Sequence, residues 1–316
     1  MIYSNSFGKN SSKILLGTAY FGSDISEETA FSIMDRFVEL GGNHIDTARM
    51  YSDGESEKIV AKWQKSRKNS NVFISTKGGF PYVEAPDISR LSEKDIRADI
   101  EKSLRTLQTE TIDFYWLHRD DETIPVGEII ETMNRLVKEG KIKRFGASNW
   151  RSYRIQSANN YAKENTLMGF EASQIRISPA ITAPGGNADQ TLVEMTKDEF
   201  EFYKSSNLPV AAYAAQAKGF FSKMALFGKD GLSDKAKERY LCSENLKKFQ
   251  YIKKLSEKYE CSVASIVCGS LCSINKPDVF PIIGGRTAEQ IEDSMCGADL
   301  ALKTAELHEL FGYRLV

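Results

Sequence analysis

The chain has 316 residues, of which 41% are hydrophobic and 27% are charged, with a formal net charge of -1. This composition excludes a disordered or fibrous protein, and the charge gives no reason to expect nucleic acid or an anionic membrane surface as a partner. No apolar run approaches the roughly 18 residues of a membrane span, and the N-terminal stretch MIYSNSFGKNSSK lacks the apolar core of a secretion signal. We therefore expect a cytoplasmic protein with an ample core.

Apolar clusters and amphipathic stretches alternate along the chain, which predicts strands and helices in turn. We expect the first strands at 13–17, 43–46, 72–77 and 112–118, and helices after them at 25–40, 55–68, 91–108 and 126–141. Further strands are expected at 144–148, 169–175, 208–214 and 279–284. Ser26 or Asp24 is the expected cap of the first helix, Ser92 opens the third, and Gly140 ends the fourth.

About eight strand–helix units thus follow one another without an obvious linker. Alternation of this kind requires parallel strands joined by helical crossovers, either in an open doubly wound sheet or in a closed barrel. The number of units and the chain length favour the barrel, and no GxGxxG motif supports the open sheet. GTAYFG (17–22) is not followed by Lys-Ser/Thr, so it is not a P-loop. We predict an α/β protein, a single (β/α)₈ TIM barrel domain over residues 1–316.

The chain contains five cysteines and no CxxC motif. Cys261, Cys268 and Cys272 recur at helical spacing, but no histidine lies nearby and their neighbours are small and apolar. Free cysteine commonly behaves as a small hydrophobe. We therefore expect a packed helix face here and no metal site.

Charged or polar side chains stand where three successive predicted strands end. Asp46 closes NHID, Lys77 closes VFISTK and His118 closes IDFYWLH, while Tyr51 lies in the loop after Asp46. In a barrel the carboxyl ends of the strands carry the chemistry, so we expect these groups to converge. Read singly, each has a structural explanation: Asp46 as a turn cap, Tyr51 as a loop aromatic, Lys77 as a surface lysine.

Together these four residue types form an acid suited to carbonyl reduction. The pKa of a tyrosine hydroxyl, about 10, is too high for easy proton donation, and an adjacent lysine ammonium lowers it. A carboxylate keeps that lysine charged, and a histidine can orient a carbonyl oxygen by hydrogen bonding. We therefore predict a catalytic set of Asp46, Tyr51, Lys77 and His118, with Tyr51 as the proton donor.

From about Ile14 to Ser294 the chain resembles the aldo-keto reductases. Their signature of glycine, apolar-Asp-Thr-Ala, Tyr, Gly and Ser/Ala-Glu is filled by Gly41, 45–48, Tyr51, Gly54 and Ser56-Glu57. The family's catalytic tetrad falls on Asp46, Tyr51, Lys77 and His118. The resemblance implies a (β/α)₈ barrel that binds NADP(H) without a Rossmann fold.

The resemblance also implies a cofactor site. Ser148, Asn149 and Gln174 match the residues that hold the nicotinamide carboxamide, and Tyr213 matches the aromatic on which the ring stacks. In PIIGGRTAEQIEDS (281–294), Arg286 is suited to a 2′-phosphate and Gln290 to a second contact, which predicts NADPH over NADH. The remaining expected contacts are Gly17, Thr18, Asp46, Ala214, Gln216, Gly219, Gly284, Asp293 and Ser294.

The chain departs from the family pattern around the substrate. Ala19 replaces a frequent Trp, Ile177 replaces a Tyr, and Ser294 stands where Asn is usual. We expect the pocket to be lined by Tyr20, Tyr51, Phe80, His118 and Trp150. We predict loops at 178–196 and 219–240 and expect them to select the substrate.

These features predict NADPH-dependent reduction of a small aldehyde, ketone or sugar carbonyl, with no protein partner indicated. One alternative is an NADPH-binding regulatory subunit with little turnover, as in the family's potassium-channel β subunits. Another is a barrel aldolase that forms a Schiff base through Lys77. The aldolase would leave Ser148, Asn149 and the Arg286 segment without a purpose.

Overall fold

The computed structural model describes residues 2–68, 72–186 and 189–312. Within these residues, eight parallel strands close into a barrel in the order β10-β3-β4-β5-β6-β7-β8-β9. The barrel strands are β3 (Leu15–Gly17), β4 (His44–Asp46), β5 (Phe73–Gly78), β6 (Phe114–Leu117), β7 (Phe145–Ser148), β8 (Ser173–Arg176), β9 (Val210–Tyr213) and β10 (Val279–Ile283). The closed barrel confirms the predicted fold class.

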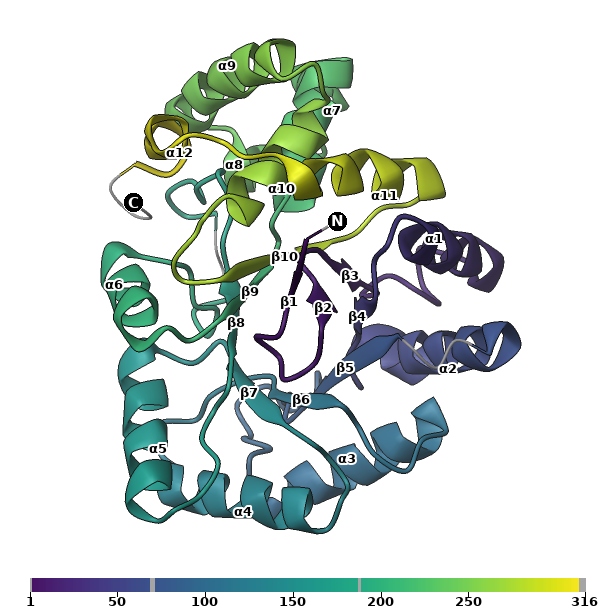
Figure 1. Cartoon of the computed structure of the whole chain (residues 1–316), viewed down its shortest axis with the longest axis vertical. Coiled ribbons are helices and arrows are strands. Elements are labelled where there is room, and N and C mark those ends of the chain that lie inside the picture. Colours follow the sequence, from purple (N-terminus) through teal and green to yellow (C-terminus); the bar gives the residue numbers. More distant parts are fainter. Residues whose placement is uncertain (1, 69–71, 187–188, 313–316) are drawn as a thin grey trace.

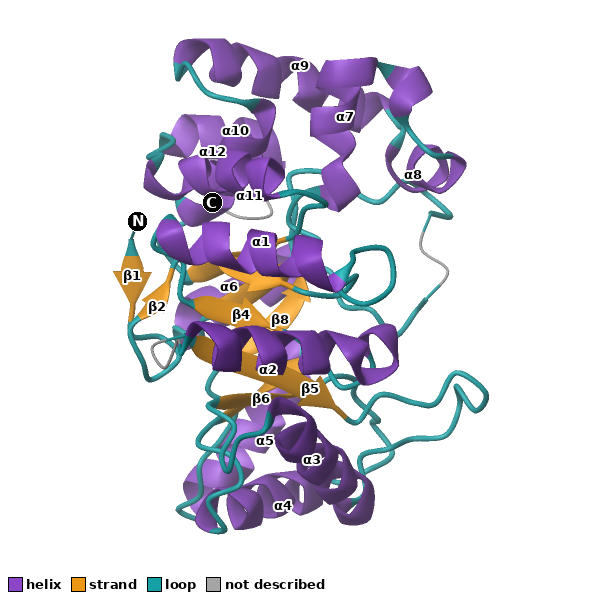
Figure 2. Cartoon of the chain, turned by 90° about the vertical axis from the view of Figure 1, so that its right-hand side faces the viewer, coloured by secondary structure: helices purple, strands orange, loops and turns teal. Residues whose placement is uncertain are grey.

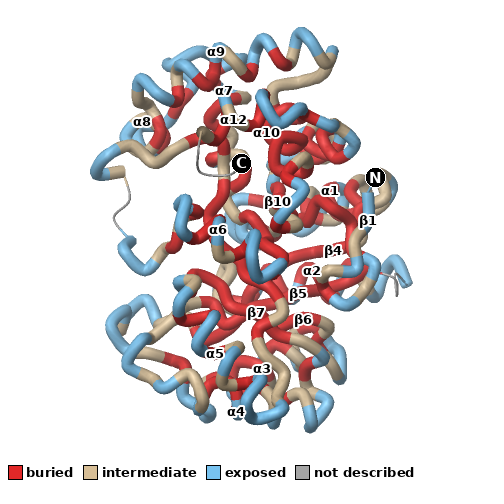
Figure 3. Tube along the Cα trace, turned by 60° about the vertical axis from the view of Figure 1, so that its left-hand side comes forward, coloured by how far each residue is buried: buried red, intermediate tan, exposed pale blue. Residues whose placement is uncertain are grey.

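Helices surround the barrel (Figure 1). Those of the first half are α1 (Glu27–Glu39), α2 (Glu55–Arg67), α3 (Glu93–Leu107), α4 (Val126–Lys138), α5 (Ser152–Glu164) and α6 (Lys197–Ser206). Those that follow are α7 (Phe220–Phe227), α8 (Asp234–Tyr240), α9 (Ser243–Lys258), α10 (Val263–Cys272), α11 (Ala288–Met295) and α12 (Thr304–Phe311). Buried residues concentrate on the strands and on the inner faces of the helices (Figure 3).

The predicted helix caps are present. The Ser26 hydroxyl accepts a hydrogen bond from the backbone N–H of Thr29 at the start of α1, and Ser92 accepts from Asp95 at the start of α3. Gly140 follows α4 in the left-handed region, with φ +74°. Each cap satisfies backbone groups that a helix end leaves without an intrahelical partner.

An antiparallel hairpin of β1 (Tyr3–Ser4) and β2 (Ser11–Ser12), which the sequence did not indicate, lies across the N-terminal end of the barrel (Figures 1 and 2). Its connecting loop places Phe7, which is fully buried, against the rings of Phe114, Trp116 and Phe280. This end of the barrel is therefore filled by a closed aromatic cluster. The long connections lie at the opposite end (Figure 2).

The expectation of a loop at 219–240 is wrong, because most of this segment is helical. Phe220, Phe221 and Met224 of α7 bury their side chains in the main core cluster, and Ser233 caps α8. Glycines at 228 and 231 keep the two helices short, which made the segment look like a loop in the sequence. The other expected loop, 178–196, contains no helix or strand in its described part.

The cysteine-containing helix α10 packs as predicted. Cys268 and Cys272 are buried in a core cluster, and Cys261 lies just before the helix with a half-buried side chain.

In the described part of the chain, no helix is long and apolar enough to cross a membrane.

Candidate active site

The four predicted catalytic residues meet at the C-terminal end of the barrel. Asp46 is the last residue of β4, Lys77 lies near the end of β5, and His118 directly follows β6. These three strands are neighbours and run parallel, so their carboxyl ends share one edge. Tyr51 begins a short 3₁₀ helix in the connection from β4 to α2.

Asp46 and Lys77 form a buried ion pair below Tyr51. The Lys77 ammonium donates to Asp46 Oδ2 and to the Thr47 carbonyl at 2.7 Å, while Ser75 Oγ donates to Asp46 Oδ1 at 2.8 Å. The Lys77 side chain is fully buried and the Asp46 side chain is 2% exposed. Such a pair persists only when both charges are hydrogen-bonded, as they are here.

The Tyr51 ring covers this pair and faces His118. Lys77 Nζ lies 4.9 Å from the centroid of the Tyr51 ring, and the rings of Tyr51 and His118 are 6.0 Å apart at 80°. The Arg49 backbone N–H donates to the Lys77 carbonyl at 3.0 Å, which ties the loop carrying Tyr51 to β5. The phenol is therefore held in place by backbone as well as by packing.

The pKa values of Lys77 and Tyr51 are both raised, but for different reasons. Burial lowers the pKa of Lys77, but the attraction of Asp46 and Tyr51 outweighs it, and the net pKa is raised. Burial also raises the pKa of Tyr51 by more than the Lys77 charge lowers it. Lys77 therefore lowers the pKa of Tyr51 as predicted, but burial, which the sequence could not weigh, makes the net shift upward. At neutral pH the site holds an ammonium and a protonated phenol, and a charged ammonium does not fit the Schiff-base alternative.

His118 is a neutral imidazole with a spare ring nitrogen. Burial lowers its pKa well below the usual value, and the charges of Lys77 and Arg119 add to that effect. Its Nδ1 atom is buried without a hydrogen-bond partner among the described residues. The Phe80 ring packs against the imidazole at a centroid distance of 5.0 Å. The described protein therefore leaves one ring nitrogen of this histidine without a hydrogen bond.

The residues expected around the nicotinamide lie beside this set. Gln174 Nε2 donates to Asp46 Oδ1 at 3.3 Å, which joins β8 to the tetrad. Asn149 Nδ2 donates to Ser148 Oγ at 3.2 Å, and its Oδ1 accepts from the Tyr213 hydroxyl at 2.7 Å. Asn149 has φ +59°, an uncommon backbone state at a strand end that holds its side chain in the barrel mouth.

The residues expected around the phosphates and adenosine lie on the β10–β3 side of the mouth. Gly17 ends β3, and Thr18 is fully buried and hydrogen-bonded to Ser56. Gln216 Nε2 donates to Ser294 Oγ at 2.9 Å, linking the segment after β9 to α11. The other members lie in the segments after β9 and β10 and on α11: Ala214, Gly219, Gly284, Arg286, Gln290 and Asp293.

Arg286 is solvent-exposed at the start of this α11 segment. Its side chain is 69% exposed and pairs with Asp24 at 2.9 Å, while its backbone N–H donates to Gln290 Oε1 at 2.8 Å. An exposed ion pair of this kind contributes little free energy. Arg286 is therefore available to exchange partners.

Tyr20 and Phe80, both expected to line the substrate pocket, keep exposed surface. Tyr20 is 49% exposed, and Phe80 is half-buried against His118. Trp150, also expected there, is fully buried: it packs on Phe170 and donates from Nε1 to the Arg119 carbonyl at 3.0 Å. The structure gives Trp150 no exposed surface with which to line the pocket, because its whole side chain packs in the main core cluster.

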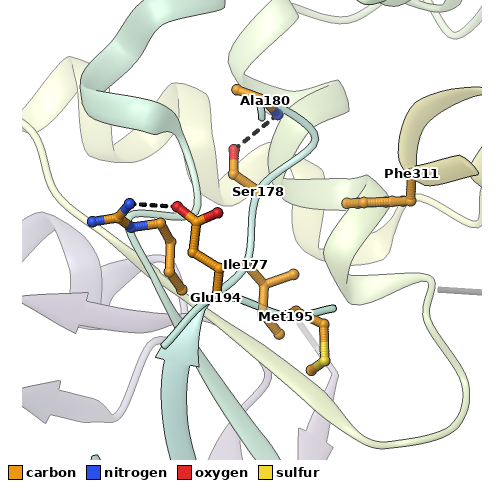
Figure 4. Close-up of a pocket in the computed structure, with 7 residues that line it drawn as sticks. Ile177, Ser178, Ala180, Glu194, Met195 and Phe311 are labelled. Carbon is orange, nitrogen blue, oxygen red and sulfur yellow. Dashed lines mark hydrogen bonds and ion pairs between the residues drawn. The ribbon is translucent and has the colours of Figure 1, made fainter. Parts of the chain in front are cut away.

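A small pocket lies beside the mouth rather than at the tetrad. It is lined by residues from β8, the loop after it, and α12: Arg176, Ile177, Ser178, Ala180, Glu194, Met195 and Phe311. Figure 4 shows the Glu194 carboxylate and the apolar side chains around it. None of the predicted catalytic residues lines this pocket, so we do not assign the reaction to it.

Sequence reasoning missed three supporting features of the site. Ser75, which holds Asp46, stands two residues before Lys77 and so shares its face of β5, a period-two signal that could have found it. Asp99 of α3 accepts from Arg90 and from the backbone of Gly79, and it pairs with Arg49 at 3.4 Å. Arg119 follows His118 directly and reaches over Phe80. No short-range pattern connects Asp99 to the site.

Comparison with known proteins identifies the family. The family model described as "Aldo/keto reductase family" matches residues 13–311. The chain belongs to the aldo/keto reductase family. This confirms the resemblance found in the motifs, and this aldo/keto reductase is accordingly an oxidoreductase.

Several characterised and uncharacterised relatives align with nearly the whole of this reductase. It is 29% identical to norsolorinic acid reductase B of Dothistroma septosporum, over 95% of this chain and 77% of that protein. It is 31% identical to an uncharacterised oxidoreductase, YrpG, of Bacillus subtilis, over 93% and 90%. It is 24% identical to an aryl-alcohol dehydrogenase [NADP(+)] of Phanerodontia chrysosporium, over 90% and 76%.

The fold comparison gives the same architecture. The crystal structure of a thermostable aldo-keto reductase in complex with the inhibitor epalrestat superposes with a TM-score of 0.74, over 99% of this chain and 100% of that one. Sequence identity to it is 19%, so the likeness concerns the fold alone.

Proposed function

We propose that this reductase uses NADPH to reduce a small aldehyde, ketone or sugar carbonyl, with Tyr51 as the proton donor. The observation that carries the proposal is the buried Asp46–Lys77 pair directly beneath the Tyr51 ring, with His118 opposite. A charged ammonium beside a protonated phenol is the arrangement that a proton donor to a developing alkoxide requires. The names of the reductase and dehydrogenase relatives agree with this class of reaction.

The residues at the mouth fit a nicotinamide cofactor. Ser148, Asn149 and Gln174 bring hydroxyl and amide groups to one place, which is the chemistry that a carboxamide needs to fix its ring. Behind them, Ala214, Ala217 and Lys218 all have positive φ without being glycine. Backbone held in that state is costly, and it recurs where a chain closes on a ligand.

NADPH is favoured over NADH because of Arg286. A guanidinium can bind a 2′-phosphate through two parallel hydrogen bonds, and Gln290 stands one helical turn away. The present partner of Arg286, Asp24, is itself 48% exposed, so a phosphate dianion can replace it. Gly17, Thr18, Ala214, Gln216, Gly219, Gly284, Asp293 and Ser294 would contact the rest of the cofactor.

The chain's own groups then perform the proton chemistry. A reduced nicotinamide bound by these residues would supply the hydride for the carbonyl carbon. The neutral imidazole of His118 orients the carbonyl oxygen, and Tyr51 donates its phenolic proton to that oxygen as negative charge develops on it. The Lys77 ammonium stabilises the phenolate left on Tyr51, while Asp46 keeps the ammonium charged and in position.

Isotope transfer tests the proposal directly. NADPH deuterated at the transferable C4 position would be incubated with the reductase and benzaldehyde, and the alcohol analysed by mass spectrometry. We expect one deuterium on the alcohol carbon. Absence of cofactor oxidation with an aldehyde, ketone and sugar panel, while NADPH still binds, would contradict the proposal and favour the regulatory alternative.

A further inference from the structure

Arg119 is a cation at the proposed active site to which the reaction described above assigns no part. It follows His118 directly at the end of β6, and its guanidinium carbon lies 4.7 Å from the centroid of the Phe80 ring. Phe80 packs in turn on the imidazole of His118. Arg119 therefore extends the wall that begins with His118 and runs over Phe80.

The position of Arg119 is fixed by the protein. Its carbonyl accepts from Trp150 Nε1 at 3.0 Å, and its Nη1 atom donates to the His118 carbonyl at 3.0 Å. Its side chain is only 12% exposed. A guanidinium held in this way has already lost most of its conformational freedom, which favours the binding of an anion.

The carboxylate that now faces Arg119 is held weakly. Asp189 Oδ2 lies 3.3 Å from Nη2, and the Asp189 side chain is 44% exposed in the loop after β8. That carboxylate also accepts from the N–H and hydroxyl of Thr191, within its own loop. The Arg119–Asp189 ion pair thus consists of one long contact to a carboxylate on a surface loop. Ion pairs of this type contribute little free energy.

Two other arginines at this end of the barrel form stronger ion pairs with buried carboxylates. Arg90 makes two hydrogen bonds of 2.8 Å to Asp99, and Arg154 makes two of 3.0 Å to Asp120. The side chains of Asp99 and Asp120 are 5% and 9% exposed. Arg119 differs from both in the number, length and exposure of its carboxylate contacts.

We propose that Arg119 binds the carboxylate of the substrate, so that the reductase acts on carbonyl compounds that also carry a carboxylate. The substrate carboxylate takes the place that Asp189 now occupies, and the apolar part between it and the carbonyl packs on Phe80. A guanidinium binds a carboxylate through two charge-assisted hydrogen bonds, which sets the orientation of the carbonyl toward Tyr51 and His118. This inference rests on the proposed carbonyl reductase function.

Two substrates that differ only in carrying a carboxylate or its uncharged methyl ester test whether Arg119 binds the carboxylate. The kcat/KM values for 4-carboxybenzaldehyde and for its methyl ester would be measured with NADPH in the wild type, Arg119→Gln and Asp189→Asn. Their ratio within each variant, compared between variants, cancels the difference in intrinsic reactivity. Arg135→Gln on the outer helix α4, also the loss of one arginine, is the control for net charge.

We expect the acid-to-ester ratio to fall by roughly tenfold or more in Arg119→Gln, the scale of one lost hydrogen bond between charged groups. It should rise in Asp189→Asn, because the competing carboxylate is removed, and stay at the wild-type value in Arg135→Gln. An unchanged ratio in Arg119→Gln would overturn the inference and leave the reductase function standing.

A binding measurement decides the case in which neither probe is reduced. 4-Carboxybenzaldehyde would be titrated calorimetrically into the complex of the reductase with NADP⁺, which cannot donate a hydride. Binding in the wild type that is lost in Arg119→Gln would support the carboxylate site even if the proposed reaction failed. Equal binding in both, or none in the wild type, would contradict it.

Discussion

The two ends of the barrel hold a buried histidine in opposite ways. At the N-terminal end, His44 has hydroxyl partners for both ring nitrogens: Ser11 Oγ lies 2.9 Å from Nδ1 and Ser75 Oγ 3.0 Å from Nε2. Its ring packs edge-on against Phe7 and Phe73. At the other end, His118 keeps Nδ1 without a partner in the described structure and lies next to Tyr51 and Phe80.

The Ser75 side chain connects His44 at the closed end with Asp46 at the open end. Ser75 has a single hydroxyl proton and donates it to Asp46, so it can only accept from His44 Nε2. His44 is then the tautomer protonated on Nε2, and its other ring nitrogen, Nδ1, lies 2.9 Å from Ser11 Oγ. His44 at the closed end thus has protein partners at both ring nitrogens, whereas His118, which follows β6 at the open end, keeps one ring nitrogen without a partner in the described structure.

Removing the Phe7 ring from the aromatic cluster at the N-terminal end should have the largest effect of the changes considered. It should lower the stability of the fold and leave the catalytic rate unchanged. Phe7→Ala deletes a fully buried ring surrounded by other aromatic rings, so we expect the free energy of unfolding to fall by about 3–5 kcal/mol. Urea denaturation measures this, and kcat of the folded variant should match the wild type. A large loss of kcat in the folded protein would show that the two ends are not independent.

Substituting each histidine by glutamine in turn separates the role of His118 from that of His44. His118→Gln should lower kcat/KM roughly 10²- to 10³-fold, the usual result of removing a hydrogen-bond donor to a developing oxyanion. His44→Gln should lower the melting temperature and change kcat/KM by less than about threefold, because His44 touches no reacting group. Similar kinetic losses in both variants would mean that the comparison is wrong.

The pH dependence of stability sharpens the comparison. Burial lowers the pKa of His44 well below its usual value, and the charges of Lys77 and Lys9 lower it further. The unfolded chain restores a value of about 6.5, so below that pH unfolding takes up a proton. Stability is lost as pH falls, by up to about 1.4 kcal/mol per pH unit from this group.

His44→Gln lacks that contribution. The difference in unfolding free energy between wild type and variant should therefore narrow between about pH 7.5 and about pH 5.5 in urea titrations. His118 is present in both proteins, so its own titration cancels. A difference that stays constant over this range would show that folding does not lower the pKa of His44.

The smallest effect is expected at the exposed edge of the cofactor site. Arg286→Met should weaken NADPH binding by several-fold, up to roughly tenfold, because the contact is largely solvent-exposed. Fluorescence titration measures both dissociation constants, and that for NADH is the internal control. Equal weakening of NADPH and NADH would exclude a contact to the 2′-phosphate.

The barrel strands and the residues at their ends could be predicted from the sequence because they depend on local periodicity. Strand ends locate Asp46, Lys77 and His118, and parallel neighbours must bring them together. Features that depend on packing were not accessible: the Trp150 ring turns into the core, and burial outweighs Lys77 in setting the Tyr51 pKa. The Phe7 hairpin and helices α7 and α8 were missed for a related reason, since elements this short carry too little periodicity.

Single-turnover NADPH oxidation with an aromatic aldehyde, in the wild type and in Tyr51→Phe, tests whether Tyr51 donates the proton. The variant keeps the ring above Lys77 and loses only the hydroxyl proton. We predict a rate at least roughly 10²-fold lower in the variant, with NADPH binding unchanged. An unchanged rate would contradict this prediction, because Tyr51 would then not be the acid.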